Sequence, residues 1–368
     1  MRFKSLINRG LVIFLYSAFF FHLEGKASTE VQESEKKFDI STMIFHHISD
    51  AHEWHFATVG ETHLSLSLPV ILYSSDRGLE LFSFSNLKSH DGHSSEFQGY
   101  SLNHHGKIIS TQPGRELFSF MPDAHAGHQE GAVKVFNISI TKNVASLFLS
   151  VAILFFVFIP IANSYGRRKE KAPSGIQSFF EPIVVFIRDE IALPNVGSKT
   201  DKYMPFLLTV FFFIWFNNLL GLVPGGANLS GNIAVTFSLA FITLLITVFS
   251  GNKDYWMHIL WTPGIPMWLR PIMLPVELVG IISKPFSLMV RLFANITAGH
   301  VIILSLLGLT FIFKSVAVGV AAALFSTVMS LLELFVAILQ AYVFTLLSAM
   351  YFGQATAEHE HDHSDGHH

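Results

Sequence analysis

Long apolar runs separated by short polar connections fill the second part of the chain. The runs over residues 144–163, 204–223 and 233–250 are each close to the roughly 20 residues that cross a bilayer as a helix. Two further runs, residues 271–313 and 315–351, are much longer. This pattern predicts an all-α polytopic membrane protein with five transmembrane helices.

The last two runs are too long to cross a bilayer upright. At about 1.5 Å per residue, a straight helix over the first of them would be on the order of 60 Å long, against about 30 Å of hydrocarbon. We therefore expect a C-terminal hairpin of two long, tilted helices that presents one extended side to whatever packs beside it. The alternative is that each run breaks into a span and a short interfacial piece, at Pro275 or Pro285.

A different pattern lies between the first and second spans. Apolar residues recur at helical spacing from Ile176 to Ile191, and the charged residues Glu181 and Arg188 fall between them. This pattern is typical of an amphipathic helix that lies in the membrane interface rather than crossing the bilayer.

The part of the chain before the first span is polar and rich in histidine. Within it, stretches such as Leu64 to Leu68 and Phe136 to Ile140 alternate apolar and polar residues, which predicts strands. We therefore expect a small β-containing extramembrane extension.

The first residues carry the features of an export signal. Arg2 and Lys4 precede a short apolar run, and small residues end it near Ala27. This predicts a cleavable signal peptide. The alternative is an uncleaved anchor helix, for which the apolar run is short.

The basic residues predict the orientation. Arg167 begins a basic cluster directly after the first span, the connection over residues 221–232 carries no charge, and Lys253 and Arg270 follow the third span. Connections rich in Lys and Arg stay in the cytoplasm, so we expect a multi-pass protein of the cell inner membrane with a periplasmic extension and a cytoplasmic C-terminus. The expected domains are a signal peptide (1–27), a His-rich periplasmic extension (28–140), a membrane domain (141–352) and a His-rich cytoplasmic tail (353–368).

Composition narrows the class of protein further. Hydrophobic residues make up 51% of the chain and charged residues 14%, and the formal net charge is −3, which fits a membrane protein and argues against a nucleic-acid partner. The chain has no cysteine, which excludes disulfides, Cys-ligated metals and thiol nucleophiles. We expect no cofactor.

Polar residues inside the two long runs are the candidate functional residues, since each Arg or Lys at the centre of a span costs roughly 2.5 to 3.5 kcal/mol. Glu277, Lys284 and Arg291 follow one another at intervals of seven residues, and Asn295 comes four later, so all four fall near one helix face. His300 lies about 13 Å further along the axis than Arg291.

The second long run carries Glu333 and Gln340, again seven residues apart. In an antiparallel hairpin we expect His300 beside Glu333 and Arg291 beside Gln340. A water-filled route for protons or ions accounts for the whole set. The alternative is a group of internal salt bridges that only fixes helix packing.

The run SLMVRLFANITAGH, from Ser287 to His300, resembles the signature of subunit a of F-type ATP synthases. The resemblance covers about residues 140–352. Supporting motifs are Pro275-Val-Glu277-Leu, Ser283-Lys284-Pro285, Asn217-Asn218-Leu-Leu-Gly221-Leu-Val-Pro224 and Leu339-Gln340-Ala-Tyr-Val-Phe.

This resemblance implies a non-catalytic channel subunit that works beside a ring of c subunits and a b-subunit stalk. Arg291 would face the ring and attract each ring carboxylate as it loses its proton. Protons would enter from outside past His300 and Glu333, along a route lined by Asn217 or Asn218, Asn295 and Gln340. They would leave to the inside near Glu277. Lys284 belongs to the same polar stripe.

Two features depart from the common bacterial pattern of this family. The position of His300 usually holds a glutamate and that of Glu333 a histidine, so the chain resembles the exchanged arrangement of mitochondrial forms. An acid and an imidazole remain paired, and a proton-relay role is therefore expected here too. The second departure is the long extension with its signal, which the common short forms lack.

The histidines of the extension and tail allow two interpretations. We expect a solvated polar surface, and metal binding is the alternative. A role in collecting protons at the outer half-channel is a further hypothesis, motivated by the predicted location.

Other functions compete with the channel subunit. An independent secondary transporter for ions or metals would show internal repeats, and none is convincing in this sequence. A membrane-embedded hydrolase would carry a motif such as His-Glu-x-x-His, and a nucleotide enzyme a Gly-rich loop with Gly-Lys-Ser/Thr; the sequence contains neither.

Overall fold

The computed structural model of the chain describes most of the residues after the first fifty. The described residues are 50–59, 62–88, 95–103, 106–118, 133–167, 172–223, 226–261, 266 and 270–357. The predicted signal peptide and the tail beyond residue 357 lie outside them.

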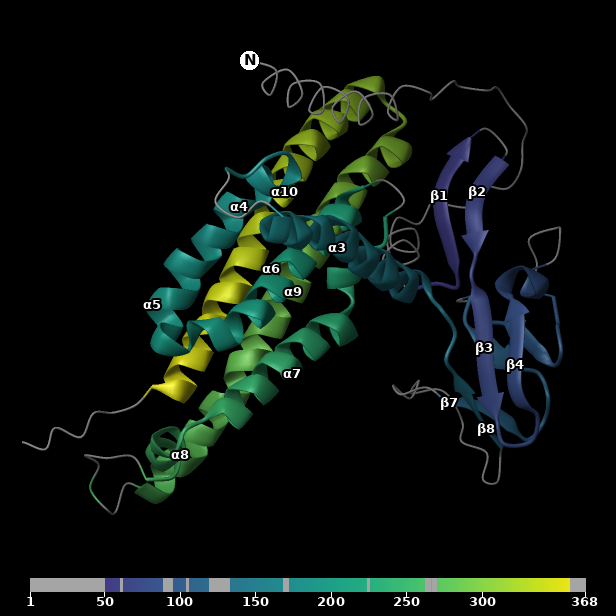
Figure 1. The fold of residues 1–368 in the computed structure, drawn as a ribbon. Helices are drawn as coiled ribbons and strands as arrows, with labels where there is room; N and C mark the ends of the chain where they lie inside the picture. Colours follow the sequence, from purple (N-terminus) through teal and green to yellow (C-terminus); the bar gives the residue numbers. More distant parts are fainter. Residues whose placement is uncertain are drawn as a thin grey trace, which may run out of the picture. The chain divides into compact units, whose positions relative to one another are not determined.

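The extension contains eight described strands, as the alternating residues predict (Figure 1). A β1–β2 hairpin, a four-stranded sheet in the order β4-β3-β8-β7 and a β5–β6 hairpin make up its sheets, and only the β7–β8 pair is parallel among the described strands. The strands are β1 (Glu53–Val59), β2 (Thr62–Ser67), β3 (Pro69–Ser74), β4 (Gly78–Ser83), β5 (Tyr100–Leu102), β6 (Ile108–Ser110), β7 (Arg115–Phe118) and β8 (Val133–Asn137).

One face of the four-stranded sheet covers a small core. Val70, Leu72 and Val135 are completely buried there, and they pack with Leu87 and Tyr100, which are also completely buried. Leu87 belongs to the 3-10 turn η1 (Phe84–Leu87). These residues alternate with exposed ones along each strand, as a sheet with one buried face requires.

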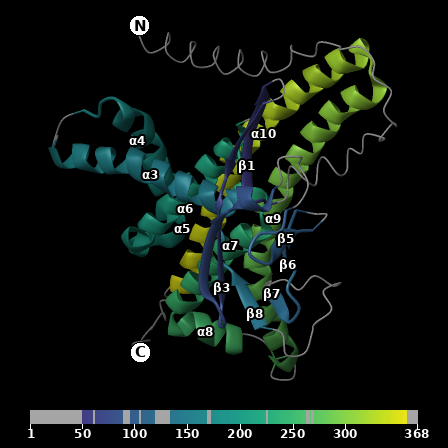
Figure 2. The ribbon, with the colours of Figure 1, turned by 90° about the vertical axis from the view of Figure 1, so that its right-hand side faces the viewer.

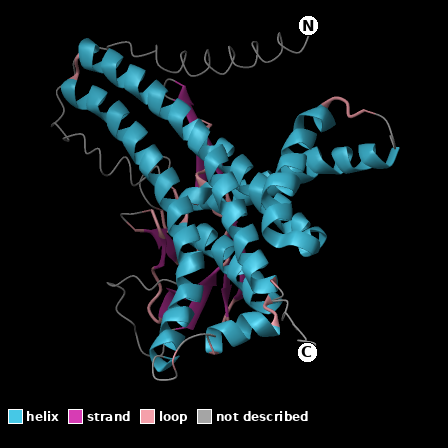
Figure 3. Cartoon of the chain, turned by 90° about the vertical axis from the view of Figure 1, so that its left-hand side faces the viewer, coloured by secondary structure: helices cyan, strands magenta, loops and turns pink. Residues whose placement is uncertain are grey.

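The rest of the described chain is helical (Figure 3). The main helices are α3 (Lys142–Arg167), α4 (Ile176–Phe186), α6 (Thr200–Leu222), α7 (Ile233–Ser250), α8 (Lys253–Leu260), α9 (Arg270–Phe313) and α10 (Val316–Thr356). Short helical segments η2 (Ile187–Ala192), α5 (Leu193–Val196), η3 (Gly197–Lys199) and η4 (Leu229–Gly231) connect them. Five described helical segments are long and apolar enough to cross a membrane, which confirms the predicted number.

The interfacial helix expected over residues 176–191 differs from the structure in its end. The π-helical segment η2 and the helix α5 extend it to Val196, where Gly197, with a φ of 67°, ends the helix before α6 begins at Thr200. Pro194 lies at the start of α5 and does not interrupt this helix.

The two long C-terminal runs form single helices. Residues Arg270–Phe313 make α9 and Val316–Thr356 make α10. Pro275 and Pro285 lie inside α9 without dividing it, so the alternative of broken runs is not observed. Figure 2 shows α9 and α10 side by side as a hairpin.

Residues 301–331, the turn end of this hairpin, belong to a different compact unit from the other described residues. Lys314 turns the chain with a φ of 45°, and its N–H donates to the carbonyl of Thr310 at 3.1 Å.

Aromatic residues dominate the core of the membrane helices. Phe158 of α3 lies 4.6 Å from Phe212 of α6 between ring centroids, and Phe180 of α4 lies 5.4 Å from Phe158. Phe180 and Phe212 are themselves 5.7 Å apart in an edge-to-face arrangement. Such tilted contacts suit aromatic rings and hold the three helices together.

The C-terminal end of α10 is held closely by three other segments. A Cβ on Gly353 would lie 1.8 Å from the carbonyl oxygen of Asn195, so only glycine allows this approach. The carbonyl of Thr356 accepts hydrogen bonds from Lys199 Nζ at 3.1 Å and from Asn252 Nδ2 at 3.0 Å.

The extension passes directly into the first span. Beyond β8, the N–H groups of Ile138 and Ile140 still donate to β3, at 2.9 and 3.2 Å. The first N–H groups of α3 are satisfied by residues before β1: Lys142 donates to the carbonyl of Ala51 and Asn143 to a carboxylate oxygen of Asp50.

Candidate functional site

The centre of the candidate site is a contact between the two long helices. His300 of α9 places Nδ1 at 2.5 Å from Oε1 of Glu333 on α10. The side chains are 15% and 4% exposed. The predicted neighbourhood of these two residues is confirmed.

The hydrogen bonds of His300 fix where a proton must lie. Its Nε2 is 3.2 Å from the carbonyl oxygen of Gly221, which can only accept, so Nε2 carries a hydrogen. Nδ1 and the carboxyl oxygen of Glu333 then need one proton between them to approach this closely. The pair is imidazolium with carboxylate or imidazole with carboxylic acid, and moving one proton along the hydrogen bond interconverts the two.

Gly299 makes room for the carboxyl group of Glu333. A Cβ at this position would lie 2.9 Å from Oε1 and 3.0 Å from Cδ of Glu333, closer than side chains normally approach. The second carboxyl oxygen, Oε2, is buried and has no hydrogen-bond partner among the residues described.

Two buried asparagines of α6 lie in the same part of the helices. Asn218 donates through Nδ2 to the carbonyl of Ala337, one turn after Glu333 on α10, and accepts a hydrogen bond from Ser230 Oγ at 2.6 Å. Asn217 donates to the carbonyl of Phe213, while its Oδ1 is buried without a partner in the described part of the chain. Both asparagines are at most 3% exposed.

Arg291 and Gln340 have different surroundings. Arg291 is exposed on α9, as is Asn295 one turn later, whereas Gln340 of α10 is 4% exposed. The sequence predicts that Arg291 and Gln340 are neighbours. Among the described residues, no hydrogen bond or ion pair joins them.

Lys284 has a partner that the sequence reading did not identify. Its Nζ donates to Oε1 of Gln354 at 2.8 Å and lies 5.4 Å from the ring centroid of Tyr351. A small cavity beside it is lined by Thr243, Thr247, Tyr255 and Tyr351, among others. Burial and the nearby Glu277 carboxylate raise the pKa of Tyr255, which places Glu277 near this cavity.

The sequence reading also missed Ser230 as a site residue and Gly221 as the source of a carbonyl ligand. Ser230 lies in the connection between the second and third spans, whose sequence indicates only turns. The carbonyl of Gly221 belongs to the backbone, so the type of residue does not reveal it.

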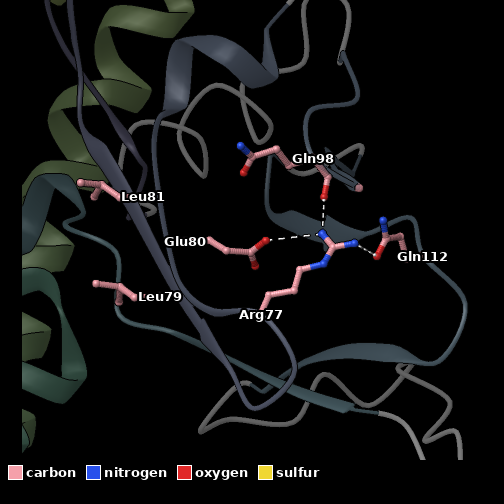
Figure 4. A pocket seen from close by; sticks show the side chains of 7 residues that line it. Arg77, Leu79, Glu80, Leu81, Gln98 and Gln112 are labelled. Atoms are coloured by element: carbon pink, nitrogen blue, oxygen red, sulfur yellow. Dashed lines mark hydrogen bonds and ion pairs between the residues drawn. The ribbon is translucent and has the colours of Figure 1, made fainter.

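A second pocket lies in the extension (Figure 4). Arg77 crosses it and donates to the carbonyl of Gln98 at 3.1 Å and to Gln112 Oε1 at 2.8 Å, with Glu80 at 3.4 Å. Its guanidinium group therefore already binds oxygen atoms of the protein.

Metal binding is the alternative interpretation of the many histidines in the chain. No group of three or more His, Cys, Asp or Glu side chains gathers in a metal-binding arrangement within the described ranges. Many of the histidines, including those of the tail, lie outside these ranges.

These observations define a helical membrane protein with a buried acid–imidazole pair and an exposed arginine on one long helix. Residues 144–353 match the family described as ATP synthase A chain, and residues 43–130 match a family described as Domain of unknown function (DUF8433). The chain belongs to the ATP synthase subunit a family.

Similar proteins carry the same description. The chain is 48% identical to "ATP synthase subunit a 2" of Chlorobaculum tepidum over 263 residues, which covers 68% of this chain and 71% of that protein. It is 43% identical to "ATP synthase subunit a 2" of Chlorobium luteolum over 286 residues, covering 75% and 81%. It is 44% identical to "ATP synthase subunit a" of Chloroherpeton thalassium over 239 residues, covering 63% and 71%.

Proposed function

We propose that the chain is the proton-translocating stator subunit of an F-type ATP synthase and forms two offset half-channels beside a ring of c subunits. The observation that carries this proposal is the placement of two kinds of polar group on α9. Arg291 is exposed, and His300 is buried against Glu333. Nine residues, about 13 Å along the axis, separate Arg291 from His300.

The buried pair is suited to the outer half-channel. The imidazole of His300 can both accept and donate a proton, which suits a relay. Together with Glu333 it holds one transferable proton. The buried oxygens Oε2 of Glu333 and Oδ1 of Asn217 need water or a proton donor, because buried polar groups without partners are costly. Asn218, Asn295 and Gln340 complete the proposed lining.

Arg291 is suited to act as a gate rather than as a carrier. A guanidinium stays protonated in proteins, so it cannot pass a proton on. It can pair with a carboxylate of the passing ring and favour its ionised form. Its charge also opposes direct passage of a proton between the two half-channels. Each proton that crosses 100 mV supplies about 2.3 kcal/mol for this cycle.

The inner half-channel is proposed at Glu277 and Lys284. Both lie toward the start of α9, and the small cavity next to Lys284 is bordered by Thr243 and Tyr255. A proton leaving the ring would reach the cytoplasm along these groups.

The proposed partners and orientation follow from the same function. The partners are the c-subunit ring, the b-subunit stalk and the rest of the ATP synthase, in contact with membrane lipid. The extension is proposed to be periplasmic and the C-terminus cytoplasmic, in the cell inner membrane.

The test is Arg291→Ala in the complete ATP synthase, reconstituted into vesicles. We expect ATP-driven proton pumping to be lost and passive proton leak to rise, because the barrier between the half-channels is removed. Arg270→Ala is the control, since this arginine begins the same helix and stacks on Trp261. Coupled pumping retained by Arg291→Ala would contradict the proposal.

A further inference from the structure

The outer face of the four-stranded sheet in the extension is apolar. Successive side chains of a strand point to opposite faces, and the inner face holds the core residues Val70, Leu72 and Val135. The opposite face is formed by Ile71, Tyr73, Leu79, Leu81, Phe118 and Phe136.

The strand register joins these residues into one surface. Tyr73 lies opposite Leu79 on one side and opposite Phe136 on the other, and Phe136 lies opposite Phe118. This row crosses all four strands. A second row joins Ile71 to Leu81. Figure 4 shows the alternation directly, since Leu79 and Leu81 point to one side of β4 and Glu80 to the other.

The large apolar side chains of this surface are strongly exposed to solvent. Leu79 is 67% exposed, Leu81 66% and Tyr73 47%. In a sheet with one face on a core, the other face normally carries polar residues, because it meets water. A contiguous apolar surface in place of them marks a site of interaction with a membrane or another protein.

The charges on this face do not favour a strongly charged partner. Lys134 and Glu116 lie opposite each other in the β7–β8 register, and their formal charges cancel. Lys134 also lies over the ring of Phe118, 5.9 Å from its centroid. A partner of this surface must therefore be recognised by its apolar character.

The chain holds this face close to a bilayer. Only Ile138 to Thr141 lie between β8 and α3, the first candidate span. At about 3.4 Å per extended residue, the end of β8 is within about 17 Å of the start of the span. The connection is also hydrogen-bonded to β3 and to Ala51, so it does not act as a loose tether.

The apolar character continues through this connection. Ile138 is 61% exposed, and Phe148 in the second turn of α3 is 60% exposed. These two side chains extend the exposed apolar surface from the sheet to the first candidate span.

We propose that the outer face of the β4-β3-β8-β7 sheet docks on the phospholipid surface at the leaflet where α3 begins. Its aromatic and leucine side chains enter the boundary between headgroups and acyl chains, and no anionic lipid is required. The extension then lies against the membrane instead of projecting into solvent.

The absence of cysteine from the chain permits a direct test. Leu81→Cys and Asn86→Cys variants of the full chain are labelled with an environment-sensitive fluorophore and reconstituted into phosphatidylcholine vesicles, alone and within the complete complex. Asn86 is the matched control, because it is exposed on η1, away from the outer face. Brominated phosphatidylcholine measures contact with lipid, and aqueous iodide measures contact with water.

We expect brominated lipid to quench the Leu81→Cys label severalfold more than the Asn86→Cys label, at low and high salt alike. Strong quenching of the Leu81→Cys label by iodide would place the face in water and overturn the proposal. Protection from both quenchers would show that protein covers the face, and would overturn it as well. The quenching results do not depend on whether Arg291→Ala loses or retains pumping, so the two proposals can fail separately.

Discussion

His300 Nδ1 and Glu333 Oε1 lie 2.5 Å apart although 33 positions separate the two residues in the sequence. They meet because α9 and α10 run antiparallel around a turn at Lys314. The two side chains form one hydrogen-bonded unit, so changes to either residue should act on the same step of the proposed route.

Removing the titratable group of Glu333 should block the proposed outer route. In Glu333→Gln the side chain keeps its size but cannot ionise, and we expect the rate of ATP-driven pumping to fall by at least about tenfold, within the range that proton-transfer groups contribute. Dye quenching in vesicles that contain the whole complex measures this rate. The exchanged double variant His300→Glu with Glu333→His should pump faster than either single variant, because it restores an acid beside an imidazole. A double variant no better than its parents would contradict a shared unit.

Gly299→Ala should weaken pumping through a steric effect on Glu333. The new Cβ would lie 2.9 Å from Glu333 Oε1, so the carboxyl group must move away from its present position. Gly280→Ala is a matched control on the same helix, since its Cβ would meet no atom within 4 Å. The control should keep its pumping rate and should stabilise α9 by up to about 1 kcal/mol. Equal effects of the two substitutions on pumping would argue against the steric explanation.

Ser230→Ala should destabilise the helices around Asn218. It removes the hydroxyl that donates to Asn218 Oδ1 at 2.6 Å and leaves a buried acceptor unpaired, at a cost of about 1–3 kcal/mol. Thermal unfolding of the full chain in detergent measures the loss. Ser238→Ala serves for comparison, because Ser238 is exposed and bonds only to Ala234 of its own helix. A change in the unfolding temperature that is no larger for Ser230→Ala would contradict the prediction.

The extension should lose stability in strong acid. The hydrogen bond from Arg115, at 2.8 Å, lowers the pKa of Asp76 from 3.8 to about 2. Because the pKa is lower in the folded state, the stabilisation is fully present above pH 3.8 and is lost as the pH falls toward 2. The protection factors of β3 and β4 amides against hydrogen exchange in the full chain, corrected for the slower intrinsic exchange in acid, should fall over this range. Asp76→Asn should flatten that dependence, and an unchanged profile would contradict the assignment.

The number of spans and the central pair could both be predicted, because the first depends on the length of the apolar runs and the second on helical spacing. Apolar length alone gives the five spans. Polar residues at helical spacing on two antiparallel runs bring His300 to Glu333. The interfacial helix continues to Val196, five residues beyond the last apolar residue of the predicted pattern, because the π-helical segment η2 has no signature in residue type.

Other contacts could not be predicted, because they depend on how distant segments meet. The bond from Lys284 to Gln354 joins residues 70 positions apart, and Gln354 lies beyond the recognised motifs. The apolar outer face of the sheet depends on the parallel pairing of β7 with β8, and alternation within a strand does not reveal its neighbour.

The close packing of Gly353 against Asn195 has a mechanical consequence. The end of α10 is clamped there, and the carbonyl of Thr356 is held from both Lys199 and Asn252. A sideways force on the hairpin would load α10 as a beam that is fixed at this end. Such a force would be passed at this end to the segments that carry Asn195, Lys199 and Asn252.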